Sequence, residues 1–251
     1  MSTFNPQFSS ANGGQVAPSE AGWRLSLPAG EAGRYRLAQL DDYAGQARGD
    51  FPHRPPFTLR LQARISSAGL PGTWGFGLWN EPLSAQLGFG SGRKLPALPN
   101  AAWFFFASPE NHLALRDGVP GQGALAAGYR ARRCPAPLLA LGLPAAPLVL
   151  WRPTARLLRR VASQVVQQDA YQLELDPTEW HSYGLEWRAD GLQFSLDEQP
   201  VFRTALAPQG PLGLVLWLDN QYAAWRPDGG LAYGTLANPA VWLDIRDLSL
   251  N

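Results

Sequence analysis

Cysteine is almost absent from this sequence of 251 residues, and the one thiol, Cys134, cannot form an internal disulfide. A chain without disulfides suits a reducing compartment, so we expect a cytoplasmic location. Long apolar runs are also missing: none reaches the roughly 18 residues of a membrane span, and residues 1–18 lack the basic start and apolar run of a secretory signal. The formal net charge is only +1, which disfavours nucleic acid as the main partner.

Common catalytic and metal-binding motifs are missing too. The sequence has no Gly-x-Ser-x-Gly element, no phosphate-binding loop and no dinucleotide fingerprint. Its three histidines and one cysteine have no ligand spacing, so we expect no metal or cofactor, although a structural calcium ion on an Asp-rich loop stays open. His53 stands among prolines and arginines, which favours a solvated loop histidine. Cys134 has no histidine near it in sequence, which disfavours a nucleophile.

Short alternating segments dominate what is present. In residues 57–65 the apolar side chains Phe57, Leu59, Leu61, Ala63 and Ile65 alternate with polar ones, as in a strand with one wet face. Similar segments recur to the end of the chain, separated by Gly/Pro turns. This pattern predicts an all-β antiparallel β-sandwich, a single domain over residues 21–251, preceded by a loose arm at residues 1–20.

Residues 72–82 form the most unusual strand. Trp74, Phe76 and Leu78 would share one face because successive side chains alternate. Gly75, Gly77 and Trp79 would share the other face and leave an open shelf where a ligand could approach the backbone. Two further segments, residues 101–108 and 211–220, are apolar on both faces, which predicts central strands covered on both sides.

Residues 118–170 interrupt the strand rhythm and are predicted to form a Pro-rich insert that ends in one helix over residues 153–168. Thr154 is a candidate cap, and Leu157, Leu158, Val161 and Val165 lie at helical spacing. The helix could pack on the rim of the sandwich, form a lid over a cleft or lie on a membrane surface. The insert is also a candidate interface for a homo-oligomer.

The run Trp180-His181-Ser182-Tyr183-Gly184-Leu185-Glu186-Trp187, a short turn and then Phe194-Ser195-Leu196-Asp197-Glu198-Gln199-Pro200-Val201 resembles glycoside hydrolase family 16. The resemblance implies a concanavalin-like jelly roll, the fold of related lectins and glucanases, with a concave cleft. That family carries Glu, Asp and Glu on its catalytic strand, whereas the corresponding residues 101–108 have no carboxylate. A retaining glycosidase needs two carboxyl groups about 5–5.5 Å apart, so the resemblance implies the fold and not the hydrolysis.

Two main hypotheses follow, with a structural or assembly role through the insert as a third. The first is a non-hydrolytic, lectin-like protein whose aromatic concave cleft binds a glycan or small molecule. The second is an enzyme, either with a relocated carboxyl pair, Glu81 and Asp219, or acting on an apolar substrate under the insert. The candidate ligand-binding residues are the aromatic and amide side chains near the expected cleft: Trp74, Trp79, Asn80, Trp103, Phe105, Trp217, Asn220, Tyr222 and Trp225.

Overall fold

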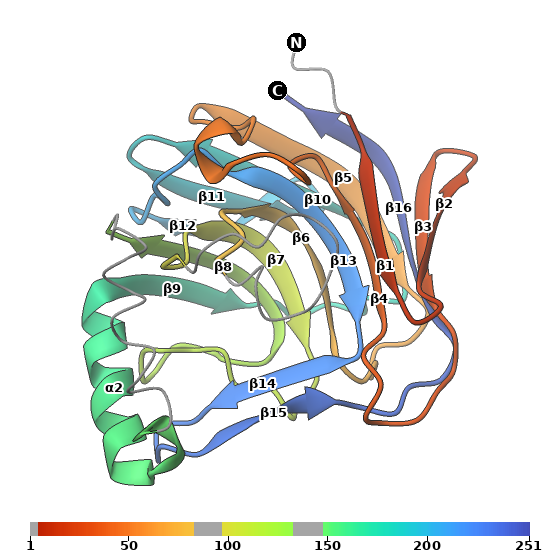
Figure 1. The fold of residues 1–251 in the computed structure, drawn as a ribbon. Helices are drawn as coiled ribbons and strands as arrows, with labels where there is room; N and C mark the ends of the chain where they lie inside the picture. Colours follow the sequence, from red (N-terminus) through yellow and green to blue (C-terminus); the bar gives the residue numbers. More distant parts are fainter. Residues whose placement is uncertain (1–4, 83–96, 133–147) are drawn as a thin grey trace.

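The computed structural model describes residues 5–82, 97–132 and 148–251, and it confirms an all-β antiparallel sandwich (Figure 1). One sheet, called the cleft sheet below, has seven strands in the order β1-β4-β13-β6-β7-β8-β9. The other, called the back sheet, has seven in the order β12-β11-β10-β5-β16-β3-β2. A separate hairpin, β14-β15, lies below the hollow side of the cleft sheet (Figure 1).

The elements have the following bounds: β1 Gln7–Ala11, β2 Gln15–Ser19, β3 Gly22–Leu27, β4 Leu37–Asp41, η1 Arg48–Asp50, β5 Phe57–Ile65, β6 Thr73–Trp79, β7 Ala101–Ala107, β8 Gly123–Ala131, α2 Arg152–Val165, β9 Val166–Gln172, β10 His181–Arg188, β11 Gly191–Leu196, β12 Gln199–Thr204, β13 Gly213–Asp219, β14 Gln221–Trp225, β15 Leu231–Thr235 and β16 Val241–Leu250.

The main core lies between the two sheets and follows the period of two. The predicted apolar face of β5 is buried at every position, from Phe57 to Ile65. Opposite it, Phe76 of β6 and Phe104 of β7 contact Tyr183 of β10 with ring centroids 4.9 and 5.0 Å apart. The sandwich therefore rests on one continuous apolar layer, and the second face of the cleft sheet is left for other contacts.

The N-terminal residues differ from the expected loose arm. Residues 7–11 form β1, which pairs with β4 at the edge of the cleft sheet. Residues 15–19 form β2, which pairs with β3 at the edge of the back sheet. The turn between them uses Asn12 and Gly13 at positive φ. Their Gln and Ser side chains hid the strands from a hydrophobicity pattern, because an edge strand can be polar on its solvent side.

The predicted insert is shorter than residues 118–170. Residues 123–131 form β8, which is a regular strand between β7 and β9 in the cleft sheet. Its alanines and glycines pass as loop residues in sequence, yet Ala126 and Ala127 are buried. The departure from the sheet lies between β8 and β9, and Cys134 falls in the part of the chain that the structure does not describe.

The predicted helix is confirmed as α2, with a different start. Trp151 occupies the N-cap position without a side-chain bond, and Thr154 lies inside the helix. In Figure 1, α2 stands at one side of the molecule, between the start of β9 and the β14-β15 hairpin. Over the described residues, no helix has the length and apolar character needed to cross a membrane.

Candidate functional site

A cluster of aromatic rings covers the outer face of the cleft sheet. Trp79, Trp103, Phe105 and Trp217 come from three adjacent strands, β6, β7 and β13, and all four line one hollow of about 240 Å³. Trp103 is central: its ring centroid lies 6.0 Å from Trp79, 5.6 Å from Phe105 and 5.6 Å from Trp217. The structure thus brings together four of the predicted ligand-binding side chains.

Two glycines of β6 make room for these rings. A Cβ atom at Gly75 would clash with the Phe104 carbonyl oxygen and would lie 2.7 Å from the six-membered ring of Trp217. One at Gly77 would clash with the Ala102 carbonyl oxygen and would lie 2.5 Å from Cα and Cβ of Trp103. The expected open shelf is therefore wrong, because backbone and side-chain atoms of the neighbouring strands cover the glycines. The absence of side chains at these glycines lets Trp103 and Trp217 lie close to the sheet, and the glycines affect the hollow only through these two residues.

The hollow has a roof made by two segments from elsewhere in the chain. Asn111 and Leu113 of the loop after β7 lie opposite Gln221 and Ala223 of β14. The two segments are joined by hydrogen bonds: the His112 N–H donates to the Ala223 carbonyl at 2.9 Å, and the Asn111 side-chain Oδ1 accepts from the Ala223 N–H at 3.0 Å. Leu113 and Ala223 add apolar contact. This roof turns the concave face into a partly covered pocket.

One end of the hollow carries a buried acid. Asp219 Oδ1 accepts the Thr73 hydroxyl at 2.8 Å, and its Oδ2 accepts the Tyr35 hydroxyl at 3.3 Å. Thr73 Oγ1 also accepts the Trp217 Nε1–H at 3.0 Å. Burial raises the pKa of Asp219 to about 7, and these hydrogen bonds only partly oppose that rise. Asp219 is therefore poised between a proton donor and an acceptor near neutral pH.

The opposite end of the hollow is held by a second polar network. Trp79 Nε1 donates to the Tyr43 hydroxyl at 2.7 Å, and Gln39 Nε2 donates to Asp41 Oδ2 at 2.9 Å. Burial raises the pKa of Asp41 from its usual value. Trp79 and Trp217 both use their indole N–H on protein partners; Trp79 is half-buried, whereas Trp217 is only 8% exposed, so Trp79 has more ring surface left for a ligand.

Glu81 and Asp219 do not form a relocated carboxyl pair. Strands β6 and β13 are neighbours, as that hypothesis required, but they run antiparallel: Asp219 lies opposite Thr73, and Gly213 lies opposite Trp79. Glu81 follows Trp79, so one strand length, about 20 Å, separates it from Asp219. Either kind of glycosidase needs less than about 10 Å. Of the described residues that line the hollow, Asp219 alone carries a carboxyl group.

Two predicted amide ligands serve the fold. Asn220 is fully buried, and its side chain accepts the Arg36 N–H and donates to the carbonyls of Arg34 and Leu236. Asn80 donates to the Leu98 carbonyl and accepts the Asn100 N–H. Both follow strands, as turn residues that satisfy backbone groups commonly do.

Three predicted aromatic ligands also lie outside the hollow. Trp74 is buried between the sheets and stacks on Phe106 with ring centroids 3.6 Å apart, so its place among the ligand residues was wrong. Tyr222 packs against Gly234 of the β14-β15 hairpin. The Trp225 carbonyl accepts Arg159 of α2 at 3.1 Å. Adjacent residues of one strand point to opposite faces, and this separates Trp74 from the shelf.

Four lining residues that sequence reasoning missed are Tyr35, Gln39, Thr73 and Leu113. Tyr35 and Gln39 stand in a segment that reads as a strand, but nothing local shows that their side chains meet β13 residues. Only strand order places β4 beside β13, with Asp219 opposite Leu37. Such long-range juxtaposition has no signal in a single sequence.

His53 is another correction, because it is buried and not solvated. Its Nε2 lies 2.6 Å from Asp42 Oδ2, and its backbone exchanges two hydrogen bonds with Leu212. Asp42 Oδ1 also accepts the Leu214 N–H at 2.9 Å. This buried pair joins the loop before β5 to β13 and does not line the hollow.

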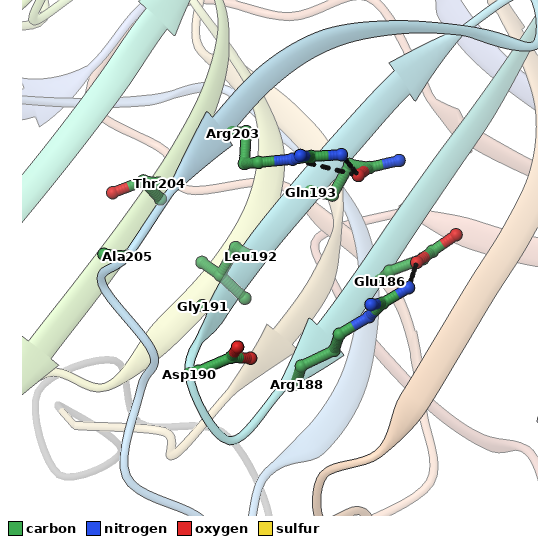
Figure 2. A pocket seen from close by; sticks show the side chains of 9 residues that line it. All are labelled: Glu186, Arg188, Asp190, Gly191, Leu192, Gln193, Arg203, Thr204 and Ala205. Atoms are coloured by element: carbon green, nitrogen blue, oxygen red, sulfur yellow. Dashed lines mark hydrogen bonds and ion pairs between the residues drawn. The ribbon is translucent and has the colours of Figure 1, made fainter.

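A second hollow, of about 290 Å³, lies at the tip of the β10-β11 hairpin (Figure 2). Four of its polar side chains form two pairs: Arg188 donates to Glu186 at 2.8 Å, and Arg203 Nε donates to Gln193 Oε1 at 3.1 Å. It offers no aromatic ring to a ligand. Across the described ranges, no group of three or more His, Cys, Asp and Glu side chains is placed to hold a metal ion.

Solved structures with known names share the fold. The chain is similar to a β-glucanase from Bacillus licheniformis, with 11% identity, a TM-score of 0.50 and coverage of 100% of this chain and 92% of that one. It is also similar to an endo-β-galactosidase from Clostridium perfringens (11%, TM-score 0.49, 92% of this chain) and to a carbohydrate-binding module from Bacillus subtilis (8%, TM-score 0.42, 97% and 94%). The chain spans about half, 53%, of the endo-β-galactosidase. No protein-family model and no curated protein matches the sequence.

The likeness to the β-glucanase confirms the concanavalin-like jelly roll that the resemblance implied. At 11% identity it shows the fold and nothing finer. The choice between binding and catalysis therefore rests on the side chains of the hollow.

Proposed function

We propose that this chain binds the end of a glycan in the roofed aromatic hollow and does not hydrolyse it. The observation that carries this proposal is the cluster of Trp79, Trp103, Phe105 and Trp217 on the cleft sheet with a single carboxyl group beside it. Sugar rings stack their C–H faces on aromatic rings, and tryptophan offers the largest such surface. The carboxyl of Asp219 supplies one directional hydrogen bond to a hydroxyl.

The size of the hollow points to a short ligand. Ligand pockets commonly measure roughly 300–1,000 Å³, and this one, of about 240 Å³, falls just below that range. The roof over Trp103 also closes the route that a long polysaccharide would take across an open concave face. A terminal sugar, or one sugar at the end of a chain, matches these dimensions.

The absence of a carboxyl pair supports binding over hydrolysis. Asp219 of β13 lies opposite Leu37 of β4. Asp41, which accepts a hydrogen bond from the lining residue Gln39, lies four residues after Leu37 on β4. Four strand residues span about 13 Å, beyond the separation that either glycosidase mechanism uses. The apolar lining of the hollow supports the alternative of an enzyme that acts on an apolar substrate. That alternative placed the substrate under the insert, whereas the roof of the hollow comes from residues 111–113 and 221–223 and not from α2.

Calorimetry with a panel of mono- and disaccharides tests the proposal, with Trp103→Ala as the companion variant. We expect one sugar class to bind and the variant to lose that binding. Parallel assays with chromogenic glycosides should show no hydrolysis by the wild type or by Asp219→Asn. A different result would assign the hollow to an apolar small molecule: no sugar gives heat, a planar apolar dye binds, and Trp103→Ala abolishes binding of the dye.

A further inference from the structure

Helix α2 is attached to the body of the protein through arginine side chains. Arg159 is 5% exposed, and it donates to the Trp225 carbonyl at 3.1 Å and to the Ala114 carbonyl at 2.9 Å. It also forms an ion pair with Asp117. Arg156 Nε donates to the Asp228 carbonyl at 2.7 Å. Ala155 and Arg159 are the two buried residues of the helix.

The apolar side of α2 therefore faces outward. Leu157 is 60% exposed, Val161 47% and Val165 40%. Residues just before the helix continue this surface, with Leu150 78% and Trp151 66% exposed. The rim packing expected from the sequence would have buried these side chains, and burying each would stabilise the fold by about 1.5–3 kcal/mol. Among the parts of the chain that the structure describes, Figure 1 shows no helix or strand on the outer side of α2.

The charges on the helix itself are all positive, and the nearby acids Asp117 and Asp228 interact with Arg159 and with Arg152 and Arg156, respectively. Helix α2 contains four arginines and no acidic residue. Arg159 is neutralised by Asp117, and Arg156 is bound to a carbonyl, whereas Arg152 and Arg160 are exposed beside the apolar side chains. Arg160 lies three positions from Leu157, so the two are neighbours on the helix surface.

We propose that α2 and residues 148–151 dock on an anionic lipid surface. An amphipathic helix that offers Leu, Val and Trp beside arginines lies in the plane of a membrane interface, with its apolar side among the lipid chains and its cations at the head groups. A second copy fits less well, because face-to-face helices would bring Arg152 and Arg160 of both copies together. The proposal is independent of the glycan site.

The docking should be weak, reversible and sensitive to salt. A 14-residue helix has only a few exposed apolar side chains, and stable attachment to membranes generally takes two signals. Attraction between exposed arginines and anionic lipids is screened within about 10 Å at 0.1 M salt. High salt should therefore release most of the protein.

Co-sedimentation with vesicles tests the inference on the full chain. We expect binding to phosphatidylcholine vesicles that contain phosphatidylserine, and much weaker binding to phosphatidylcholine alone. The double variant Leu157→Gln/Val161→Gln keeps the charge and the helix propensity, and it should lose most of the binding. Arg152→Gln/Arg160→Gln should weaken binding roughly fivefold per arginine, since each basic side chain near an anionic surface contributes on the order of that factor.

Phe8→Gln is the matched control, because Phe8 is an equally exposed apolar residue, 55% exposed, on the far edge of the cleft sheet. It should bind vesicles like the wild type. Equal binding to neutral and anionic vesicles, or undiminished binding of the Leu157/Val161 variant, would overturn the proposal. A concentration-dependent dimer in light scattering that this variant abolishes, without vesicle binding, would assign the surface to a second copy. All variants should retain sugar binding, which separates this test from that of the hollow.

Discussion

The outer faces of the two sheets both carry tryptophan, but the tryptophan rings have different neighbours on the two faces. On the cleft sheet, Trp103 contacts Trp79 and Trp217 under a roof. On the back sheet, arginines lie over the rings: Arg64 is 4.8 Å from the centroid of Trp180, and Arg24 is 4.6 Å from that of Trp242.

This difference shows what turns a tryptophan-rich face into a binding surface. On the back sheet, the guanidinium groups occupy the ring faces, and Asp244 ties Arg24 down through two bonds of 2.6 and 2.8 Å. A ligand would have to displace them. In the hollow, the rings contact one another in tilted pairs, and Trp79 and Trp103 stay partly exposed between sheet and roof. The count of ten tryptophans alone does not distinguish these cases.

The sharpest test of this contrast compares two truncations. Trp103→Ala should cost about 3–5 kcal/mol of stability, or somewhat less because the ring is half-buried, and it should abolish sugar binding. Trp242→Ala on the back sheet should leave sugar affinity unchanged and cost about 1 kcal/mol, because it loses cation–π contacts at a partly exposed site. Urea unfolding and calorimetry measure both. Equal loss of sugar affinity in the two variants would contradict the assignment of the hollow.

The next test uses pH and the acid at the end of the hollow. The pKa of Asp219 rises from 3.8 to about 7 in the folded state, so the native protein binds more protons than the unfolded chain between these values. Its contribution to stability is thus largest below pH 4 and declines as the pH rises through about 7, by up to about 4 kcal/mol at roughly 1.4 kcal/mol per unit.

Asp219→Asn should remove this decline, because the amide oxygen can still accept the Thr73 hydroxyl. The stability of the variant relative to wild type should therefore increase between pH 4 and 8, as measured by urea unfolding across that range. A constant difference at all these pH values would show that Asp219 is not the titrating group.

A third test concerns the glycines beneath the rings. Gly75→Ala places a Cβ atom in clash with the Phe104 carbonyl oxygen and 2.7 Å from the Trp217 ring, so both β7 and the ring must shift; it should cost about 1–3 kcal/mol or more and weaken sugar binding. Gly69→Ala is the matched control, because nothing lies within 4 Å of its Cβ position. It should be neutral in thermal unfolding and in calorimetry. If both variants bind sugar normally, the depth of Trp217 does not matter for the ligand.

The smallest effect is expected on the back sheet. Arg64→Gln removes ring contacts to Trp180 and Trp242 and a 3.4 Å contact to Asp244, all partly exposed. We expect under about 1 kcal/mol of destabilisation, reduced further by salt. Sugar affinity should not change. A loss above about 2 kcal/mol would mean that the stacked arginines act as a cooperative network.

Much of the fold could be predicted from local patterns. The alternation in residues 57–65 and the apolar residues 101–108 identified β5 and β7, and helical spacing identified α2. Strands β1, β2 and β8 were missed, because polar edge residues and runs of Ala and Gly carry no hydrophobic signal of a strand. The cytoplasmic location and the role of Cys134 stay predictions.

The site was predictable only in part. The structure brings the predicted side chains Trp79, Trp103, Phe105 and Trp217 together in one hollow, and their contact with a ligand stays a prediction. Trp74 and the Glu81–Asp219 pair were wrong, because a strand's face and its direction against its neighbour decide where a side chain lies. Both depend on pairing between segments distant in sequence.

By itself, the order of residues determined that strands would form, which of their faces would be apolar, and that family-type carboxylates are missing from residues 101–108. Tertiary structure alone decided that β6 and β13 run antiparallel, that residues 111–113 and 221–223 roof the rings, and that α2 buries Arg159 while its leucine and valine side chains stay exposed. The physical reason is the sequence separation of the interacting residues. Side-chain alternation depends on residues two positions apart, whereas the pairing of β6 with β13 and the roof contacts involve residues more than 100 positions apart.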